Sequence, residues 1–196
     1  LILGAGEVGM SLERIVGGLL ADKDWRELKP RDLDILHICF PYFEGFVNEV
    51  KEAQAKFKPK YTVIHSTVPI GTSDKCNSIH SPIRGIHPNL EEGIRTFPKF
   101  LGGSTGSEIA DYFRKVGLKV ILFDKTETTE AMKLFDTEYY RVCIEFTQRV
   151  KRYCDKKGLN FHEVYTLANQ SYNEGYTKLN HPEFVRPVLQ PILTPI

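Results

Sequence analysis

The 196-residue sequence has no long apolar run, no cluster of basic residues and no closely spaced pair of cysteines. Its longest apolar stretches are strand-sized, so a transmembrane helix is excluded. The net charge is +1, and without a basic run neither nucleic acid nor an anionic membrane surface is indicated as a partner. The four cysteines and six histidines show no CxxC, HxxxH or HxxE spacing, which predicts that no metal is bound. No signal peptide is visible, and we expect a cytoplasmic protein with reduced cysteines.

Over its first 125 residues the sequence alternates between apolar strand-like segments and segments with helical periodicity. The strand-like segments are residues 1–3, 33–41, 61–68, 84–88, 99–103 and 119–124, and the helical ones are 7–20, 46–57 and 107–117. Alternation of this kind is typical of βαβ units. We therefore predict an α/β fold with a Rossmann-like parallel sheet and helices on both faces.

The pattern changes after this alternation ends. Residues 128–158 predict one long helix, because neither glycine nor proline interrupts them before their last position. A second helix is predicted over 161–169, and the proline-containing tail from 171 is predicted to be irregular. The sequence thus indicates a dinucleotide-binding domain over 1–125, a connecting helix region over 126–170 and an irregular tail over 171–196.

A Gly-x-Gly-x-x-Gly motif, Gly4, Gly6 and Gly9, stands between the first strand and the first helix. In a dinucleotide-binding turn the first glycine permits the tight turn, the second lets the backbone approach a diphosphate, and the third allows close helix–strand packing. Glu7 and Val8 then open a helix whose free N–H groups attract an anion. The motif predicts NAD binding, and the alternative is a glycine turn that binds nothing.

The acidic residue that would bind the adenosine ribose is not evident. A second strand ending in Asp or Glu is expected about twenty residues after the turn. The residues between Gly18 and the next strand are polar and do not look strand-like, and the sequence begins without methionine. We therefore expect residues to be missing near Gly17 and Gly18, and we do not assign the ribose role to Asp22 or Asp24. NADP is accordingly not excluded as the cofactor.

Later segments resemble one known family. HSTVPIGTS (His65–Ser73) resembles the Ser-Thr-Val-Pro-x-Gly-Thr motif of the UDP-glucose/GDP-mannose dehydrogenase family. SPIRGIHPNLEEG (Ser81–Gly93) is similar to the family loop that ends in Leu-x-Glu-Gly, and residues 130–146 are similar to its connecting helix. Residues 175–187 resemble the segment before the loop with the catalytic cysteine. The resemblance implies NAD-dependent oxidation of a sugar-nucleotide alcohol.

The resemblance also implies roles for individual residues. Thr67 would position a water molecule and lie close to the nicotinamide, and Pro41 would end a strand at the cofactor edge. Lys133 would hold the oxyanion, as a fixed charge placed where negative charge develops. Leu90 and Glu92 would contact the substrate, a small nucleotide or sugar nucleotide.

The sequence also departs from the family pattern. Thr137 stands where the connecting helix carries an Asn that contacts substrate. Pro88 stands at an acidic position, which leaves the adjacent His87 as the candidate for proton handling. No cysteine lies in a Gly-Gly-x-Cys context, so the nucleophile for covalent capture is not present, and we expect that loop after Ile196. In the family the helix matching 128–158 is buried between subunits, which implies a homodimer.

Two other functions therefore stay open. One is a non-catalytic descendant that binds a nucleotide or a partner. The other is a two-electron dehydrogenase of the 3-hydroxyacid or phosphogluconate type, which needs no cysteine. Individual residues also have simpler interpretations, because Lys133 is flanked by apolar neighbours and Glu92 could be part of a solvated helix start.

Overall fold

The computed structural model describes residues 1–191 and divides the chain into two compact units, Leu1–Leu134 and Phe135–Ile196. Every described strand belongs to the first unit. Helix α6 (Thr126–Lys157) confirms the long helix predicted over 128–158, and the division between the units falls inside it. The first unit therefore includes the first turns of α6 and extends beyond the predicted boundary at residue 125.

The first unit is built on a seven-stranded sheet with the order β2-β1-β3-β4-β5-β6-β7. Strands β1 to β5 are parallel to one another. Strand β6 is antiparallel to β5, and β7 is parallel to β6. The predicted Rossmann-like α/β fold is thus confirmed, with one reversal at the β5–β6 step. The strands are β1 (Ile2–Leu3), β2 (Leu20–Ala21), β3 (Ile35–Ile38), β4 (Tyr61–Ile64), β5 (Ile79–His80), β6 (Lys99–Gly102) and β7 (Val120–Phe123).

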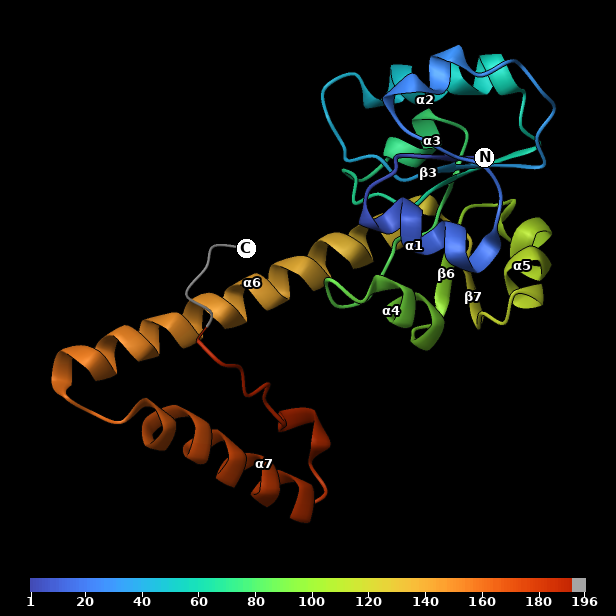
Figure 1. Ribbon diagram of the computed structural model, residues 1–196. Coiled ribbons are helices and arrows are strands. Elements are labelled where there is room, and N and C mark those ends of the chain that lie inside the picture. The colour runs from blue at the N-terminus through green and yellow to red at the C-terminus, as the bar shows by residue number, and fades with distance from the viewer. Residues whose placement is uncertain (192–196) are drawn as a thin grey trace. The chain divides into compact units, whose positions relative to one another are not determined.

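Helices cover both faces of this sheet (Figure 1). Helices α2 and α3 lie on one face, and α1, α4 and α5 lie on the other. The split follows from the alternation of β3, because Leu36 and Ile38 join the core under α2 whereas Ile35 joins the core under α4 and α5. The helices are α1 (Glu7–Val16), α2 (Phe46–Phe57), α3 (Thr72–Lys75), α4 (Leu90–Thr96) and α5 (Gly106–Lys115).

Strand β2 corrects the prediction that this strand is missing. Leu20 and Ala21 pair in parallel with β1, so the chain reaches the edge of the sheet within the residues that looked polar. The following segment forms a 3-10 turn, η1 (Lys23–Glu27), instead of a further strand. No gap near Gly17 and Gly18 is needed to complete the sheet as far as β2.

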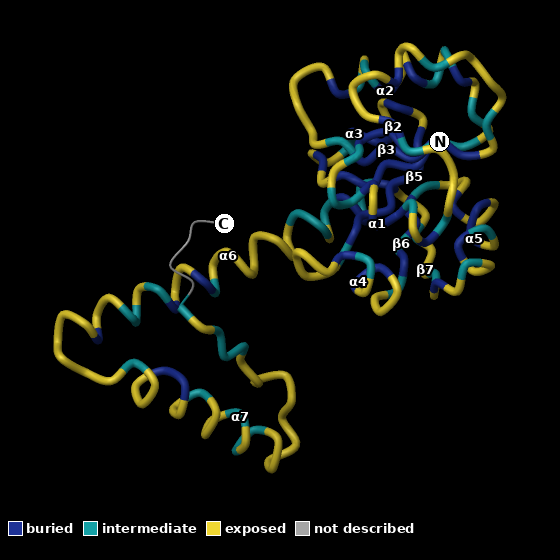
Figure 2. Tube along the Cα trace, viewed as in Figure 1, coloured by how far each residue is buried: buried dark blue, intermediate teal, exposed yellow. Residues whose placement is uncertain are grey.

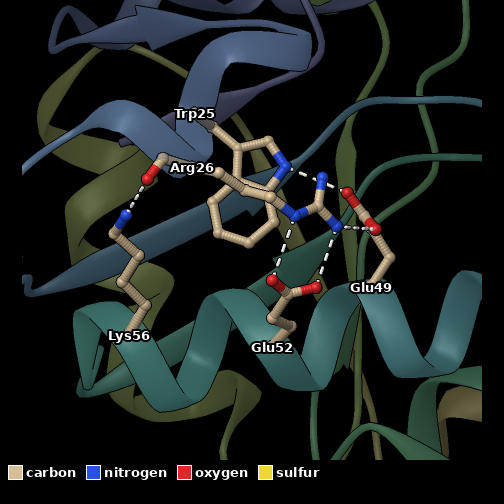
Figure 3. Close-up of polar contacts among 5 residues, drawn as sticks. All are labelled: Trp25, Arg26, Glu49, Glu52 and Lys56. Atoms are coloured by element: carbon tan, nitrogen blue, oxygen red, sulfur yellow. Dashed lines mark hydrogen bonds and ion pairs between the residues drawn. The ribbon is translucent and has the colours of Figure 1, made fainter.

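A polar cluster fastens η1 to α2 (Figure 3). The indole N–H of Trp25 donates to Glu49, at 3.0 Å, while the ring itself is buried against Phe57. Arg26 donates to the carboxylates of both Glu49 and Glu52, and Lys56 donates to the Arg26 carbonyl. These contacts explain how a segment without a strand pattern is held in one conformation.

The second unit is helical. After α6 a π-helical turn, η2 (His162–Leu167), leads into α7 (Ala168–Lys178), and η3 (Pro182–Phe184) follows. The irregular tail predicted from residue 171 therefore begins only after Lys178, and its last part, 192–196, lies outside the described residues. Within the described part of the chain, no helix is both long and apolar enough to cross a membrane.

Candidate functional site

The carboxyl ends of the parallel strands meet at one edge of the sheet. Gly4 and Asp22 come directly after β1 and β2. Pro41 and Thr67 are the third residues after β3 and β4. Helices α1 and α2 lie on opposite faces of the sheet (Figure 1). A crevice lined by Gly4, Phe40 and Pro41 lies between the ends of β1 and β3. Ligands of open α/β sheets bind at such a topological switch point.

The three glycines of the turn have different surroundings. A Cβ on Gly4, where φ is +104°, would lie 2.6 Å from the Phe40 nitrogen, and a Cβ on Gly9 would lie 1.9 Å from the Gly4 carbonyl oxygen. Both positions therefore need glycine for the fold itself. A Cβ on Gly6 would meet no atom within 4 Å, so the chain's own packing does not explain this glycine. Without a side chain at Gly6, the backbone at the start of α1 stays accessible, as the close approach of a diphosphate requires.

Asp22, to which no ribose role was assigned from the sequence, stands directly after β2. Its exposed carboxylate accepts the Ala5 N–H at 3.4 Å and thus lies beside the glycine turn. The signal in the sequence was only the pair Leu20–Ala21 before an aspartate. Asp22, Gly4 and Pro41 line one cleft of about 390 Å³, together with Lys23, Trp25, Phe40, Tyr42, Phe43 and Glu49.

The loop after β4 is fixed to its neighbours while leaving Thr67 exposed. The Ser66 hydroxyl donates to the Phe40 carbonyl at 2.6 Å, which ties the ends of β3 and β4 together. The Thr72 hydroxyl donates to the Pro69 carbonyl at 2.6 Å and closes the turn before α3. Thr67 is therefore an exposed residue on a braced loop after β4, the strand next to β3.

The first turns of α6 hold the same loop from the other side. Glu130 is fully buried, and its carboxylate accepts the N–H groups of Gly71 at 2.6 Å and Ser73 at 2.8 Å. Lys133 lies three residues further along α6 and is half-buried. The spacing of three residues places Glu130 and Lys133 on one face of α6, although the sequence alone did not indicate a role for Glu130.

His80 connects α6 with the loop after β4. Its Nδ1 lies 2.8 Å from the Thr129 hydroxyl, and its Nε2 lies 3.2 Å from the Ser66 carbonyl oxygen. Burial lowers the pKa of His80 to about 4, against a smaller raising effect of the Ser66 contact. The ring is therefore neutral at pH 7 and acts as a bridge.

The remaining predicted site residues are placed differently from one another. His87 lies on an exposed loop, with Nδ1 2.6 Å from a Glu7 carboxylate oxygen at the start of α1. Leu90 is only 3% exposed, and its side chain packs in the core. Glu92 is exposed and lines a cleft of about 490 Å³. Thr137 belongs to the second unit.

A chain of buried polar groups that the sequence analysis missed crosses the core between the sheet and α5. The Tyr112 hydroxyl lies 3.4 Å from His37 Nε2, and His37 Nδ1 lies 3.0 Å from His65 Nε2. His65 Nδ1 lies 2.8 Å from the Ser81 carbonyl oxygen and 3.1 Å from Lys99 Nζ, and Lys99 also donates to that carbonyl.

Burial dominates the ionisation of this chain. It lowers the pKa of His37 to about 3 and that of Lys99 to about 7, and it lowers the pKa of His65 well below the usual value. One set of tautomers satisfies the neutral chain: Tyr112 donates to His37, His37 to His65, and His65 to Ser81. Within residues 1–191, no group of three or more His, Cys, Asp or Glu side chains is arranged to hold a metal.

This architecture is a Rossmann-like α/β fold, and solved structures of dehydrogenases share it. The UDP-N-acetylmannosamine dehydrogenase of Staphylococcus aureus superposes with a TM-score of 0.69 at 16% identity, covering 86% of this chain and 57% of its own. A UDP-D-ManNAc dehydrogenase from Pyrococcus horikoshii has a TM-score of 0.63 at 17% identity, covering 84% of this chain and 44% of its own. The 3-hydroxyisobutyrate dehydrogenase of Mycobacterium tuberculosis has a TM-score of 0.63 at 12% identity, covering 86% of this chain and 69% of its own.

These likenesses concern the fold. The chain spans about half the length of the two nucleotide-sugar dehydrogenases, 44% of one and 57% of the other. No protein-family model and no curated protein matches the sequence. The two groups of similar structures correspond to the two dehydrogenase types that the sequence left open.

Proposed function

We propose that this chain binds NAD(H) at the crevice between β1 and β3 and serves hydride transfer from an alcohol of a nucleotide sugar. The observation that carries the proposal is Gly6, a glycine that the fold does not require, at the start of α1 beside an acidic residue that ends β2. Similarity to UDP-N-acetylmannosamine dehydrogenases supports this substrate class. The four free cysteines support a cytoplasmic location, which we also propose.

The donor groups present fit such a dinucleotide. The N–H groups at the start of α1 would hold the diphosphate, and the Asp22 carboxylate would accept hydrogen bonds from the ribose. When bound, NAD supplies the hydride acceptor. Thr67, on its braced loop, would position a water molecule that takes up the alcohol proton as the hydride leaves for NAD. The Lys133 ammonium would stabilise the negative charge that develops on the alcohol oxygen.

The Gly6→Ala substitution tests the cofactor site. The added methyl meets no atom of the chain within 4 Å, so we expect an unchanged fold and an NADH affinity that is weaker by about tenfold or more. Gly175→Ala in α7 is the matched control, because its Cβ also meets no atom within 4 Å. Titration with NADH, followed calorimetrically, measures both. Equal affinities in wild type and Gly6→Ala, or no NADH binding by the wild type, would contradict the proposal.

Asp22→Asn tests which nicotinamide cofactor is preferred. A carboxylate beside the ribose accepts its hydroxyls and repels a 2′-phosphate, so we propose NAD rather than NADP. We expect the substitution to weaken NADH binding by about tenfold and to strengthen NADPH binding, because Lys23 lines the same cleft. The exposed Asp24 provides the control variant Asp24→Asn. Tighter binding of NADPH than NADH by the wild type would exclude this assignment.

The substrate class is tested by incubating the protein and NAD with a panel of nucleotide sugars and 3-hydroxyacids while NADH formation is recorded. NADH formation with nucleotide sugars alone supports the proposal. Formation with 3-hydroxyacids instead would identify the two-electron dehydrogenase type. NADH binding without turnover of any compound would favour the non-catalytic descendant.

We further propose that the protein forms a homodimer through α6. Phe135, Tyr139 and Val142 follow one another at spacings of four and three residues, and each is at least 50% exposed. Exposed apolar side chains at this spacing form a seam suited to a second helix. Figure 2 shows how much of α6 and α7 is exposed.

Sedimentation velocity of Phe135→Glu tests the dimer. A carboxylate in the seam should raise the dimer dissociation constant by about tenfold or more. Leu179→Glu is the control, since Leu179 is 70% exposed, as Phe135 is at 69%, but lies after α7. A monomeric wild type, or an equal effect of the two variants, would rule out this interface.

A further inference from the structure

The second unit contains a cavity of about 560 Å³ between the later turns of α6 and the segment after η3. Arg149 and Arg152 reach it from α6, and Arg186 reaches it from the other wall. Tyr165 and Asn169 contribute a hydroxyl and an amide, and the one lining carboxylate belongs to Glu145. A cavity of this size accommodates a small organic ligand.

The arginines of this cavity differ from most others in the chain. Arg14, Arg26, Arg95, Arg114 and Arg141 each form an ion pair with a carboxylate. Arg149, Arg152 and Arg186 form none with any residue of the described range 1–191. Glu145 offsets at most one of these three charges, and it shares Arg141 with Glu138. The cavity wall therefore carries an excess of positive charge.

Two of the three guanidinium groups are oriented by their neighbours. Arg186 stacks on the Tyr172 ring at 4.5 Å and donates to the Asn169 amide oxygen at 3.4 Å. Its backbone is clamped by Asn173, which accepts the Arg186 N–H at 2.9 Å and donates to the Arg186 carbonyl at 2.8 Å. Arg149 lies over the Phe146 ring at 5.1 Å. Such orientation reduces the conformational entropy that an arginine loses when it binds an anion.

Tyr165 in the cavity wall is held by hydrogen bonds. It is only 5% exposed, and its hydroxyl accepts a hydrogen bond from the buried Thr147 hydroxyl at 3.0 Å and one from the Leu189 N–H at 3.4 Å. The same hydroxyl lies 3.4 Å from the Pro187 carbonyl oxygen, to which it donates. The wall that faces the arginine side chains is therefore fixed in position.

We propose that this cavity binds a small molecule that carries a phosphate or diphosphate group, held by Arg149, Arg152 and Arg186. Phosphate oxygens match the fork of a guanidinium group, and two or more negative charges would balance the excess of positive charge. The site belongs to the second unit and does not depend on the cofactor proposed for the first. Its affinity falls as salt concentration rises, because the binding groups are partly exposed.

Calorimetric titration of the full chain with pyrophosphate at low salt tests the site. We expect Arg152→Gln and Arg186→Gln to weaken binding by about tenfold each. Lys151→Gln is the matched control, because it removes the same charge from the neighbouring position of α6, where the side chain pairs with Asp155 outside the cavity. It should change the affinity less than about twofold. Circular dichroism checks that each variant keeps its helices.

Three outcomes would overturn the proposal. One is an absence of pyrophosphate binding up to about 10 mM, a concentration at which even a weak site is occupied. Another is an equal effect of Lys151→Gln and Arg152→Gln, which would indicate a general charge effect. The third is loss of pyrophosphate binding in Gly6→Ala with full retention in Arg152→Gln and Arg186→Gln, which would assign it to the glycine turn. Failure of NADH binding alone leaves these readouts unaffected.

Discussion

Lys99→Met is expected to raise the free energy of unfolding of the first unit by about 3 kcal/mol at pH 7. Lys99 is 3% exposed, and burial lowers its pKa from 10.5 to about 7, with a further lowering effect from Arg84. Nothing is left unpaired by the substitution, because His65 still donates to the Ser81 carbonyl at 2.8 Å. Methionine keeps the length of the side chain and the packing against Phe113, whose ring lies 5.7 Å from Nζ.

The stability advantage of Lys99→Met over the wild type decreases as pH rises above 7. Between pH 7 and pH 10.5 the unfolded chain holds a proton on Lys99 that the folded chain has lost. The stability of the wild type therefore rises with pH in this window, by at most about 1.4 kcal/mol per unit from this residue. Below pH 7 both states are protonated and the penalty stays constant. The advantage of the variant should thus fall below about 1 kcal/mol at pH 9.

Urea unfolding at pH 7, 8 and 9 measures the difference in free energy of unfolding between Lys99→Met and the wild type, and how it changes with pH. Trp25 is the single tryptophan and is buried in the first unit, so its fluorescence reports on that unit alone. Lys119→Met, at an exposed lysine, is the control and should change stability by less than about 0.5 kcal/mol. A Lys99→Met protein that is less stable than the wild type at pH 7 would show that the buried amine contributes favourably.

The larger expected effect is loss of stability in acid. Three buried histidines, His37, His65 and His80, stay neutral in the folded state because burial lowers their pKa values, to about 3 for His37 and about 4 for His80. In the unfolded chain they take up protons below pH 6.5. Stability therefore falls as pH falls. His37 and His80 together remove roughly 4 kcal/mol between pH 6.5 and about pH 4.5, and His65 acts in the same direction. That loss approaches the whole stability of a typical domain.

His37→Gln separates this cause from general acid unfolding. Glutamine can accept from Tyr112 and donate to His65, so the chain of hydrogen bonds persists while one titrating group is lost. We expect the slope of stability against pH to become about one third less steep. The exposed His162 supplies the control variant His162→Gln, whose slope should match the wild type. Identical slopes for all three proteins would contradict the role of the buried histidines.

The sequence predicted the fold well where periodicity was long enough to read. β3, β4 and β7 lie inside the apolar segments expected for them, and the uninterrupted pattern of α6 gave its bounds within two residues. β2 was missed because two residues are too few to show a hydrophobic periodicity, and the strand is defined by its pairing with β1. The continuation of α7 to Lys178 was missed because Gly175 lies inside it.

The site was predictable only as far as it depends on motifs. Gly4, Gly6 and Gly9 stand where the motif places them, at the carboxyl end of β1. The resemblance implied a substrate contact for Leu90, and it did not indicate that the side chain is buried in the core. Glu130, His80 and the Lys99 chain could not be predicted, because their partners come from strands and helices distant in sequence.

The brevity of β2 has a consequence for how this sheet meets other chains. A strand at the edge of a sheet offers unpaired backbone groups that can recruit another strand, and two residues offer few of them. The opposite edge is different, since β7 has four residues and leaves Ile121 and Leu122 more than 40% exposed. Strand addition and aggregation are therefore favoured at one border of the sheet, on the side away from the glycine turn.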